Sequence, residues 1–137
     1  MKTQDLMTKS VEFIEPQKSI KQAAQMMRDL HIGSLPVIKD GMLLGIITDR
    51  DICCHAIAMG RDPVMTQVQD VMNRNVATCY EDDDISKAAH LMENRHVRRL
   101  AVLHHDHSMA GMLSVDDLAR GSHDLAGAVL EAAIPVH

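Results

Sequence analysis

Two short segments of this chain carry residue types that could bind a phosphorylated or hydroxylated ligand. The first is Gly45-Ile46-Ile47-Thr48-Asp49-Arg50-Asp51, which runs from an apolar stretch into a predicted helix. Thr48 then lies near the helix start, where free backbone N–H groups and the positive end of the dipole attract anions. Asp51 lies about one turn further on, where its carboxylate could accept hydrogen bonds from two hydroxyl groups, as on a ribose.

The second segment is Gly111-Met112-Leu113-Ser114-Val115-Asp116-Asp117, with Ser114 and Asp117 at the positions of Thr48 and Asp51. For a single copy, a structural interpretation is equally good, because the hydroxyl would cap the helix and the carboxylate would complement its dipole. Capping does not need Gly, hydroxyl and Asp at one spacing twice, so the recurrence favours binding. Arg50 is a further candidate cation, and an exposed side chain without a ligand is the alternative.

The elements that must position these segments also occur twice. Residues 5–52 and 70–118 share one pattern at an offset of 65, and one residue inserted in the later hairpin brings the two segments above into line. The matched pairs are Asp5/Asp70, Met7/Met72, Val11/Val76, Ile20/Ile85, Ala23/Ala88, Ala24/Ala89, Met27/Met92, His31/His96, Leu35/Leu100 and Val37/Val102. Each half is marginal alone, and a repeat buries its apolar face against its neighbour. We therefore expect one body with an approximate two-fold axis and cavities along the seam.

Periodicity and capping signals predict the order β-α-β-β-α in each half, an α/β (α+β) fold. In the first half, the predicted elements are a strand at 11–14, a helix at 20–30, a hairpin of 35–39 and 42–48 around Asp40-Gly41, and a helix at 49–59 ended by Gly60. In the second half, they are a strand at 76–79, a helix at 85–94, a hairpin of 100–104 and 110–113, and a helix at 115–120. We interpret residues 1–60 as the first repeat and 61–121 as the second.

Two further segments flank the second repeat. Thr66 and Gln69 have the form of a capping box that opens a short helix into Val71-Met72. Residues 122–133 carry Leu125, Val129 and Ala132 at helical spacing, so 122–137 is expected to be a helical tail that closes on the body or on a partner subunit.

Composition excludes several classes of protein. The chain has a net charge of −5, no Trp, one Phe and one Tyr, so nucleic-acid binding is not expected. No apolar run approaches the ~18–20 residues that span a bilayer, and Met1–Met7 is too polar for a secretory signal. The odd count of three Cys fits a reducing compartment. We expect a cytoplasmic protein with an aliphatic core filled by its eleven Met.

Other clusters offer weaker chemistry. His104, His105 and His107 with Asp106 could bind zinc or nickel, and a solvated loop is the preferred interpretation. His31 and His96 recur at predicted helix ends, where a cation favours the dipole. Cys53-Cys54 are interpreted as buried filler, with redox sensing as the alternative. The acidic run 81–84 is expected to be a solvated loop, although a weak divalent-cation site is conceivable.

No pattern for catalysis is present, because the chain has neither a Ser/His/Asp order nor a phosphate-binding loop that ends in Gly-Lys-Ser/Thr. We therefore expect that the protein is not an enzyme.

The repeated motifs resemble those of a tandem pair of cystathionine β-synthase (CBS) domains, a Bateman module, over about residues 3–121. The resemblance rests on Asp70-Val71-Met72, His31-Ile32-Gly33-Ser34-Leu35-Pro36-Val37, His96-Val97-Arg98-Arg99-Leu100-Ala101-Val102 and the two Gly-x-x-Thr/Ser-x-x-Asp segments. It implies two repeats packed sheet to sheet, with two clefts that bind adenosine-containing ligands.

The resemblance also implies a role for each matched residue. Asp51 and Asp117 would bind ribose hydroxyls, and Thr48 and Ser114 would lie near the ribose or phosphate. The adenine edge would meet the backbone of Val76-Ala77 in one cleft and of Val11-Glu12 in the other. Arg98 and Arg99 stand at the family's phosphate-contacting position, where a planar guanidinium suits an oxyanion, and a solvated surface pair is the alternative.

Two residues depart from the family pattern. Ala101 replaces the proline seen as Pro36 in the first copy, and we expect this change to loosen the entry to that strand. Glu12 is bulky and acidic where Ala77 is small, so the cleft of Thr48 and Asp51 is expected to be the better-formed site.

These observations predict a non-catalytic regulatory module that binds AMP, ADP, ATP, S-adenosylmethionine or a dinucleotide as a regulatory ligand and requires no cofactor. Binding would change self-association or partner association by a population shift. We expect a homodimer through the helices and a separate effector protein, with neither nucleic acid nor membrane as a partner. The alternatives are a ligand-free dimerisation scaffold and a metal or redox sensor.

Overall fold

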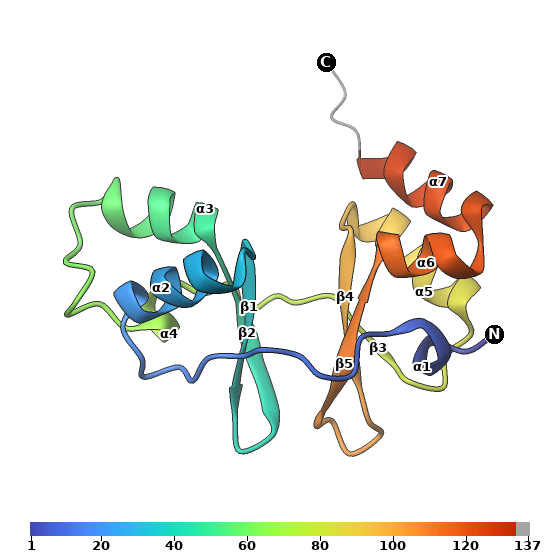
Figure 1. Ribbon diagram of the computed structural model, residues 1–137, viewed down its shortest axis with the longest axis horizontal. Helices are drawn as coiled ribbons and strands as arrows, with labels where there is room; N and C mark the ends of the chain where they lie inside the picture. The colour runs from blue at the N-terminus through green and yellow to red at the C-terminus, as the bar shows by residue number, and fades with distance from the viewer. Residues whose placement is uncertain (134–137) are drawn as a thin grey trace. The chain divides into compact units, whose positions relative to one another are not determined.

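The computed structural model describes residues 1–133, which form a mixed α/β fold in two units (Figure 1). Unit 1 combines Met1–Val11 with the chain from Ala77 onward, and unit 2 is Glu12–Val76. Each unit has its own core of aliphatic and Met side chains. The N-terminal residues therefore pack with the second repeat, and the segment that opens the second repeat packs with the first.

Unit 2 is built on a two-stranded antiparallel sheet. Its elements are α2 (Ile20–Leu30), β1 (Ser34–Lys39), β2 (Met42–Thr48), α3 (Asp49–Asp51), the π-helix η1 (Ile52–Ile57) and α4 (Val68–Val71). In Figure 1, α2 and α3 lie on the same side of the β1–β2 hairpin. The predicted capping box of Ser19 and Gln22 starts α2, and Asp40-Gly41 turns the hairpin with both residues at positive φ.

Unit 1 repeats this plan with a third strand and with α7 added, and its single helix α6 stands at the place of α3 and η1. Its elements are α1 (Thr3–Leu6), β3 (Thr78–Tyr80), α5 (Ile85–Arg95), β4 (Arg99–Leu103), β5 (Met109–Ser114), α6 (Val115–Gly121) and α7 (His123–Ala133). The sheet order is β3-β4-β5, with β3 parallel and β5 antiparallel to β4. Helix α7 packs on α5 and α6 and buries Ala126 and Val129. Of the two alternatives for the predicted terminal helix, closure on the body is therefore observed.

The strand predicted at 11–14 does not form as an extended strand; instead Ile14 makes a single parallel bridge to Val37. In unit 1, by contrast, the Ala101 N–H donates to the Ala77 carbonyl at 3.1 Å and lengthens the pairing of β3 with β4. Pro36 stands at the position of Ala101 and has no N–H to donate. The expectation that Ala101 loosens the strand entry was therefore wrong, because the missing proline restores a backbone hydrogen bond.

Two further predictions are corrected in unit 2. The helix predicted at 49–59 becomes a π-helix after Asp51, as shown by the Ala58 N–H, which donates to the Cys53 carbonyl at 2.9 Å. The helix predicted after Thr66 starts at Val68, and its capping contact joins the Gln67 N–H to Asp70 Oδ2 at 3.0 Å. The same contact joins the Lys2 N–H to Asp5 Oδ2 at 2.8 Å in unit 1, which explains the repeated aspartate at this position.

Candidate functional site

The two hydroxyl-and-aspartate motifs adopt the same geometry in the two units. The Asp51 N–H donates to Thr48 Oγ1 at 3.0 Å, and the Thr48 N–H donates to Asp51 Oδ2 at 2.9 Å. The corresponding distances for Ser114 and Asp117 are 3.2 Å and 2.9 Å. Both motifs are complete capping boxes, so one oxygen of each aspartate already holds its own helix start. The outer oxygen, Oδ1, is the one that faces further partners.

The glycine of each motif lets another segment cross the strand. Asn73 pairs with Ile46 through two hydrogen bonds of 2.9 and 2.8 Å, and a Cβ at Gly45 would lie 2.7 Å from the Asn73 carbonyl oxygen. In unit 1, a Cβ at Gly111 would lie 2.5 Å from the Thr8 carbonyl oxygen, beside the Thr8–Met112 pair. Real Cβ atoms do not approach backbone this closely, so both positions require glycine.

The crossing segments lead to the residues that the resemblance assigns to adenine. Val76 follows Asn73 within unit 2, the unit of Thr48 and Asp51, and Val11 follows Thr8 within unit 1, the unit of Ser114 and Asp117. Both valines are half-buried. The neighbours differ, since Ala77 is buried in unit 1 and Glu12 is exposed in unit 2.

Charge beside the motifs differs between the units. In unit 1, Arg99 is the cross-strand partner of Ser114, and the Val115 N–H donates to the Arg98 carbonyl at 2.9 Å. Both arginines are exposed, and they lie beside the start of α6. Unit 1 therefore brings two guanidinium-bearing residues to its own motif.

In unit 2, Ser34 and Gly33 stand at the positions of Arg99 and Arg98. A Cβ at Gly33 would lie 3.1 Å from Asp49 Oδ2. The Arg50 N–H donates to Asp49 Oδ1 at 2.8 Å, and the Arg50 side chain is exposed. The motif of unit 2 is thus flanked by an anionic side chain where unit 1 has cations.

Two residues at the motifs were missed by sequence reasoning. Arg120 Nη2 donates to Asp117 Oδ1 at 2.5 Å, and His55 Nδ1 lies 3.3 Å from Asp51 Oδ1. The spacings i,i+3 and i,i+4 on a predicted helix were the available signal. They were overlooked because the two partners occupy different positions in the two repeats.

The His-rich hairpin is engaged with the acidic run before α5. His104 Nδ1 lies 2.9 Å from Glu81 Oε2, His105 Nε2 lies 2.8 Å from Asp82 Oδ1, and the His105 ring stacks on Tyr80 with centroids 4.7 Å apart. Within residues 1–133, no group of three or more His, Cys, Asp or Glu side chains is placed to hold a metal ion. The hairpin was expected to be a solvated loop; His104 and His105 are largely exposed, but they are also paired with Glu81 and Asp82.

The pair of His105 and Asp82 predicts a pH-dependent stability. Its hydrogen bond raises the pKa of His105 and lowers the pKa of Asp82. A raised His105 pKa stabilises the fold fully below the unfolded-state value of about 6.5, and this contribution is lost as pH rises through the folded-state pKa. The Asp82 contribution is present above about pH 4 and is lost as pH falls through its lowered pKa.

We therefore expect His105→Gln to reduce the free energy of unfolding most near about pH 5–6, with the difference from wild type shrinking toward about pH 9. Urea denaturation across this range measures the effect. Asp82→Asn is the matched variant and should give the same profile. A deficit that does not change with pH would assign the effect to the Tyr80 stack instead.

The cysteines differ from the expected buried filler. Cys53 is exposed and Cys54 half-buried, whereas Cys79 is buried. Burial, with a contribution from Asp83, raises the pKa of Cys79 to about 12, so this thiol is inert at neutral pH. The filler interpretation was therefore wrong for Cys53.

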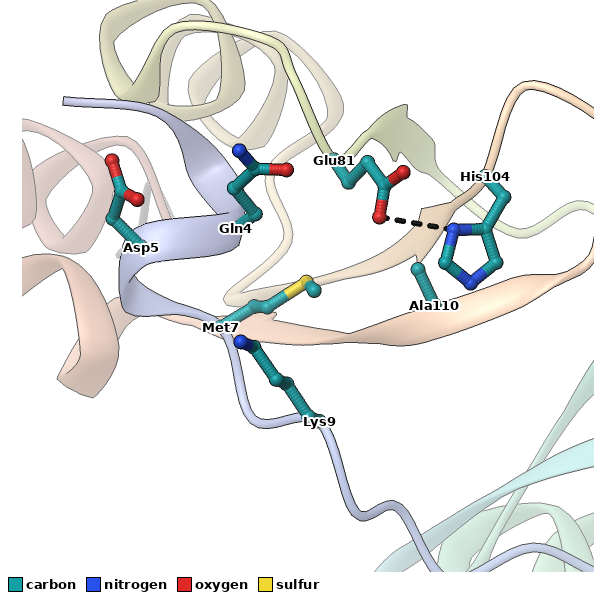
Figure 2. A pocket seen from close by; sticks show the side chains of 7 residues that line it. All are labelled: Gln4, Asp5, Met7, Lys9, Glu81, His104 and Ala110. Atoms are coloured by element: carbon teal, nitrogen blue, oxygen red, sulfur yellow. Dashed lines mark ion pairs between the residues drawn. The ribbon is translucent and has the colours of Figure 1, made fainter.

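The described surface also contains hollows away from the predicted site residues. Figure 2 shows one of about 480 Å³ in unit 1, where Glu81 and His104 form an ion pair beside Met7 and Lys9. Two other hollows, of about 400 Å³ in unit 2 and about 320 Å³ in unit 1, are related by the repeat. Their linings share three matched pairs of positions, which are Phe13/Thr78, Lys18/Asp83 and Asp29/Asn94. The internal repeat thus extends to the surface between α2 or α5 and the segment that precedes it.

Sequence comparison finds one family in both halves of the chain. The family model of the CBS domain matches residues 4–56 and 68–124. The CBS domain-containing protein YhcV of Bacillus subtilis (strain 168) is 33% identical over 128 residues, which cover 92% of this chain and 90% of the relative.

Solved structures show the same fold. A crystal structure of Hypoxic Response Protein I with two coordinated zinc ions has a TM-score of 0.81 at 29% identity, covering 89% of this chain and 99% of that one. The CBS domain pair of protein MJ0100, in complex with 5′-methylthioadenosine and S-adenosyl-L-methionine, has a TM-score of 0.74 at 26% identity and covers 88% and 94%. In residues 1–133, no helix is both long and apolar enough to cross a membrane.

Proposed function

Because the chain belongs to the CBS domain family, we propose that it is a non-catalytic regulatory module that binds an adenosyl ligand through its hydroxyl-and-aspartate motifs. The candidates are AMP, ADP, ATP, S-adenosylmethionine and a dinucleotide. The observation that carries the proposal is the pair of equivalent motifs, each with an aspartate Oδ1 turned away from its own capping contact. An adenosyl ligand is bound by the similar domain pair of MJ0100.

The roles proposed for the site residues follow the geometry of each unit. The Asp51 carboxylate binds ribose hydroxyls, and Thr48 lies near the ribose or phosphate. The crossing segment supplies backbone at Val76-Ala77 for the adenine edge. Ser114 and Asp117, with Val11-Glu12, repeat these roles in the second site.

The cations differ between the two sites. Arg98 and Arg99 provide positive charge for a phosphate group, and Arg50 is the corresponding candidate in unit 2. Since the Asp49 carboxylate lies beside Gly33, the site of unit 2 is the less favourable one for phosphate charge.

A thermal-shift screen of nucleotide-free protein tests this proposal. The panel is AMP, ADP, ATP, S-adenosylmethionine and NAD(H), with the Asp51→Ala/Asp117→Ala double variant beside the wild type. A ligand that binds only the folded state raises the apparent stability by mass action. We expect a shift in the wild type that is lost in the double variant. No shift with any ligand would instead support a dimerisation scaffold, and a zinc- or oxidant-dependent shift that survives the double variant would support a metal or redox sensor.

We also propose that the module is a homodimer that signals to an effector protein in the cytoplasm. Ala24 of α2 and Ile52 of η1 correspond to Ala89 and Leu118, which are fully buried in the core that α7 completes. Ala24 is exposed and Ile52 half-buried, because unit 2 has no helix at the place of α7. An uncovered apolar helix face of this kind favours association with a second copy.

Ala24→Glu is therefore expected to convert the dimer to a monomer, because it places a charge in the apolar contact. Sedimentation velocity measures the change. Lys39→Glu, at an exposed site on β1 of the same unit, is the matched control and should remain dimeric. A wild-type protein that sediments as a monomer would contradict the proposal.

A further inference from the structure

The outer oxygens of the two motif aspartates have different partners. Asp117 Oδ1 accepts a hydrogen bond of 2.5 Å from Arg120, and the same Nη2 atom donates to the Leu6 carbonyl at 3.1 Å. The guanidinium therefore bridges the motif and the backbone of α1. The Asp117 side chain is 10% exposed, so the contact forms at the edge of the core.

The packing of unit 1 holds this bridge in place. Helix α6 packs on α1, and a Cβ at Gly121, the residue after Arg120, would lie 2.6 Å from Leu6 Cδ1. The end of α6 is therefore pressed against Leu6, whose carbonyl receives the guanidinium. Because Arg120 is tied to the backbone of another helix as well as to Asp117, it is more restrained than an ordinary surface partner of a carboxylate.

Unit 2 lacks this device. The position of Arg120 is taken by Cys54, whose short side chain carries no cation. The remaining partner of Asp51 Oδ1 is His55, at 3.3 Å and with 65% of its side chain exposed. His55 lies in the π-helix η1, whereas Arg120 lies in the α-helix α6. The two motifs therefore have different positions of the following helix beside the outer oxygen of the aspartate. Arg120 is exposed to the same degree, 64%, so the two contacts differ in length and in the second tie of Arg120 to the Leu6 carbonyl. A hydroxyl that approaches Asp51 displaces the longer and singly held contact.

We propose that Arg120 determines how many adenosyl ligands the chain binds, because it occupies the Asp117 oxygen that a ribose hydroxyl would need. The motif of unit 2 is then the high-affinity site, because its ribose acceptor is available, although unit 1 has more positive charge for a phosphate. The motif of unit 1 binds weakly while Arg120 is present. This inference rests on the proposed function. The sequence ranked the same site first because Ala77 is small. The present ranking rests instead on the partners of the two aspartate oxygens.

Isothermal titration of nucleotide-free protein with AMP, and separately with S-adenosylmethionine, tests the inference. We expect the wild type to bind a single ligand tightly, with Asp51→Asn weakening that site roughly 10- to 150-fold. Arg120→Ala should raise the affinity of the second site about tenfold, the factor expected when an acceptor is released from one charged hydrogen bond. That gain should be absent from the Arg120→Ala/Asp117→Asn double variant, a dependence that a merely structural effect of Arg120 would not produce.

Arg28→Ala is the matched control, because Arg28 is an exposed arginine paired with Asp29 at 2.8 Å, on a helix that carries neither motif. It should leave the number of bound ligands unchanged. Retention of the tight site shows that unit 2 of Arg120→Ala is folded, and a far-UV circular dichroism spectrum like that of the wild type shows the same for unit 1. Two equal sites in the wild type, or no gain in Arg120→Ala, would overturn the inference and leave the proposed function intact. No heat from either probe in any form would overturn both.

Discussion

Replacing Gly111 with alanine is expected to lower the free energy of unfolding by about 1–3 kcal/mol, the usual cost of forcing an atom into packed space. The new Cβ would lie 2.5 Å from the Thr8 carbonyl oxygen and 3.1 Å from Met7 Sδ. The Met7 thioether can move, but Thr8 is held by two backbone hydrogen bonds to Met112 of 2.8 and 3.0 Å. The crossing segment must therefore shift, which also displaces Val11, the residue proposed to lie at adenine.

Urea denaturation measures this loss, and Gly45→Ala in unit 2 should behave alike because its Cβ would lie 2.7 Å from the Asn73 carbonyl oxygen. Gly127→Ala is the matched control, since nothing lies within 4 Å of a Cβ at that position in α7. This control should gain up to about 1 kcal/mol from helix propensity. If Gly111→Ala were as stable as the wild type, the close crossing of Thr8 would be wrong.

Asp51→Asn is expected to weaken adenosyl binding roughly 10- to 150-fold, or about 1.5–3 kcal/mol, because a charged acceptor for ribose hydroxyls is lost. The amide oxygen of asparagine can still accept the Thr48 N–H, which Asp51 Oδ2 accepts at 2.9 Å. Asp51→Ala should lose binding to a similar extent and also about 1 kcal/mol of stability, since it removes half of the capping box. Comparison of the two variants separates ligand binding from helix capping.

Titration calorimetry of the ligand identified by the thermal-shift screen measures the loss. Asp62→Asn is the matched control, because Asp62 also caps backbone in unit 2, accepting the Val64 N–H at 2.7 Å, but lies outside the motif. It should bind the ligand as tightly as the wild type. Unchanged affinity in Asp51→Asn would disprove the ribose assignment.

Local signals in the sequence were sufficient for most of the elements. The capping box at Ser19, the Asp40-Gly41 turn and the apolar spacing of residues 20–30 and 85–94 predicted helices and hairpins that the structure confirms within a residue or two. These features depend on neighbours within about four positions in the chain, so the order of residues specifies them directly.

Features that depend on distant partners were not predicted. The short pairing at Ile14 reflects the absence of an N–H at Pro36, which is 22 positions away in the sequence. The bond from Arg120 to the Leu6 carbonyl joins residues 114 positions apart. No local pattern marks such contacts, because each side chain has many possible partners until the helices and strands are packed.

The sequence by itself determined that two CBS repeats occur, most of the elements that each contains and which hydroxyl, aspartate and glycine residues recur. The tertiary structure decided that residues 1–11 pack with the second repeat and residues 68–76 with the first. It also decided that the two glycines serve the crossing of those segments and that Arg120 distinguishes the two motifs. The physical reason is that capping and periodicity act along the chain, whereas backbone crossings and the bond from Arg120 to the Leu6 carbonyl depend on which segments share a core.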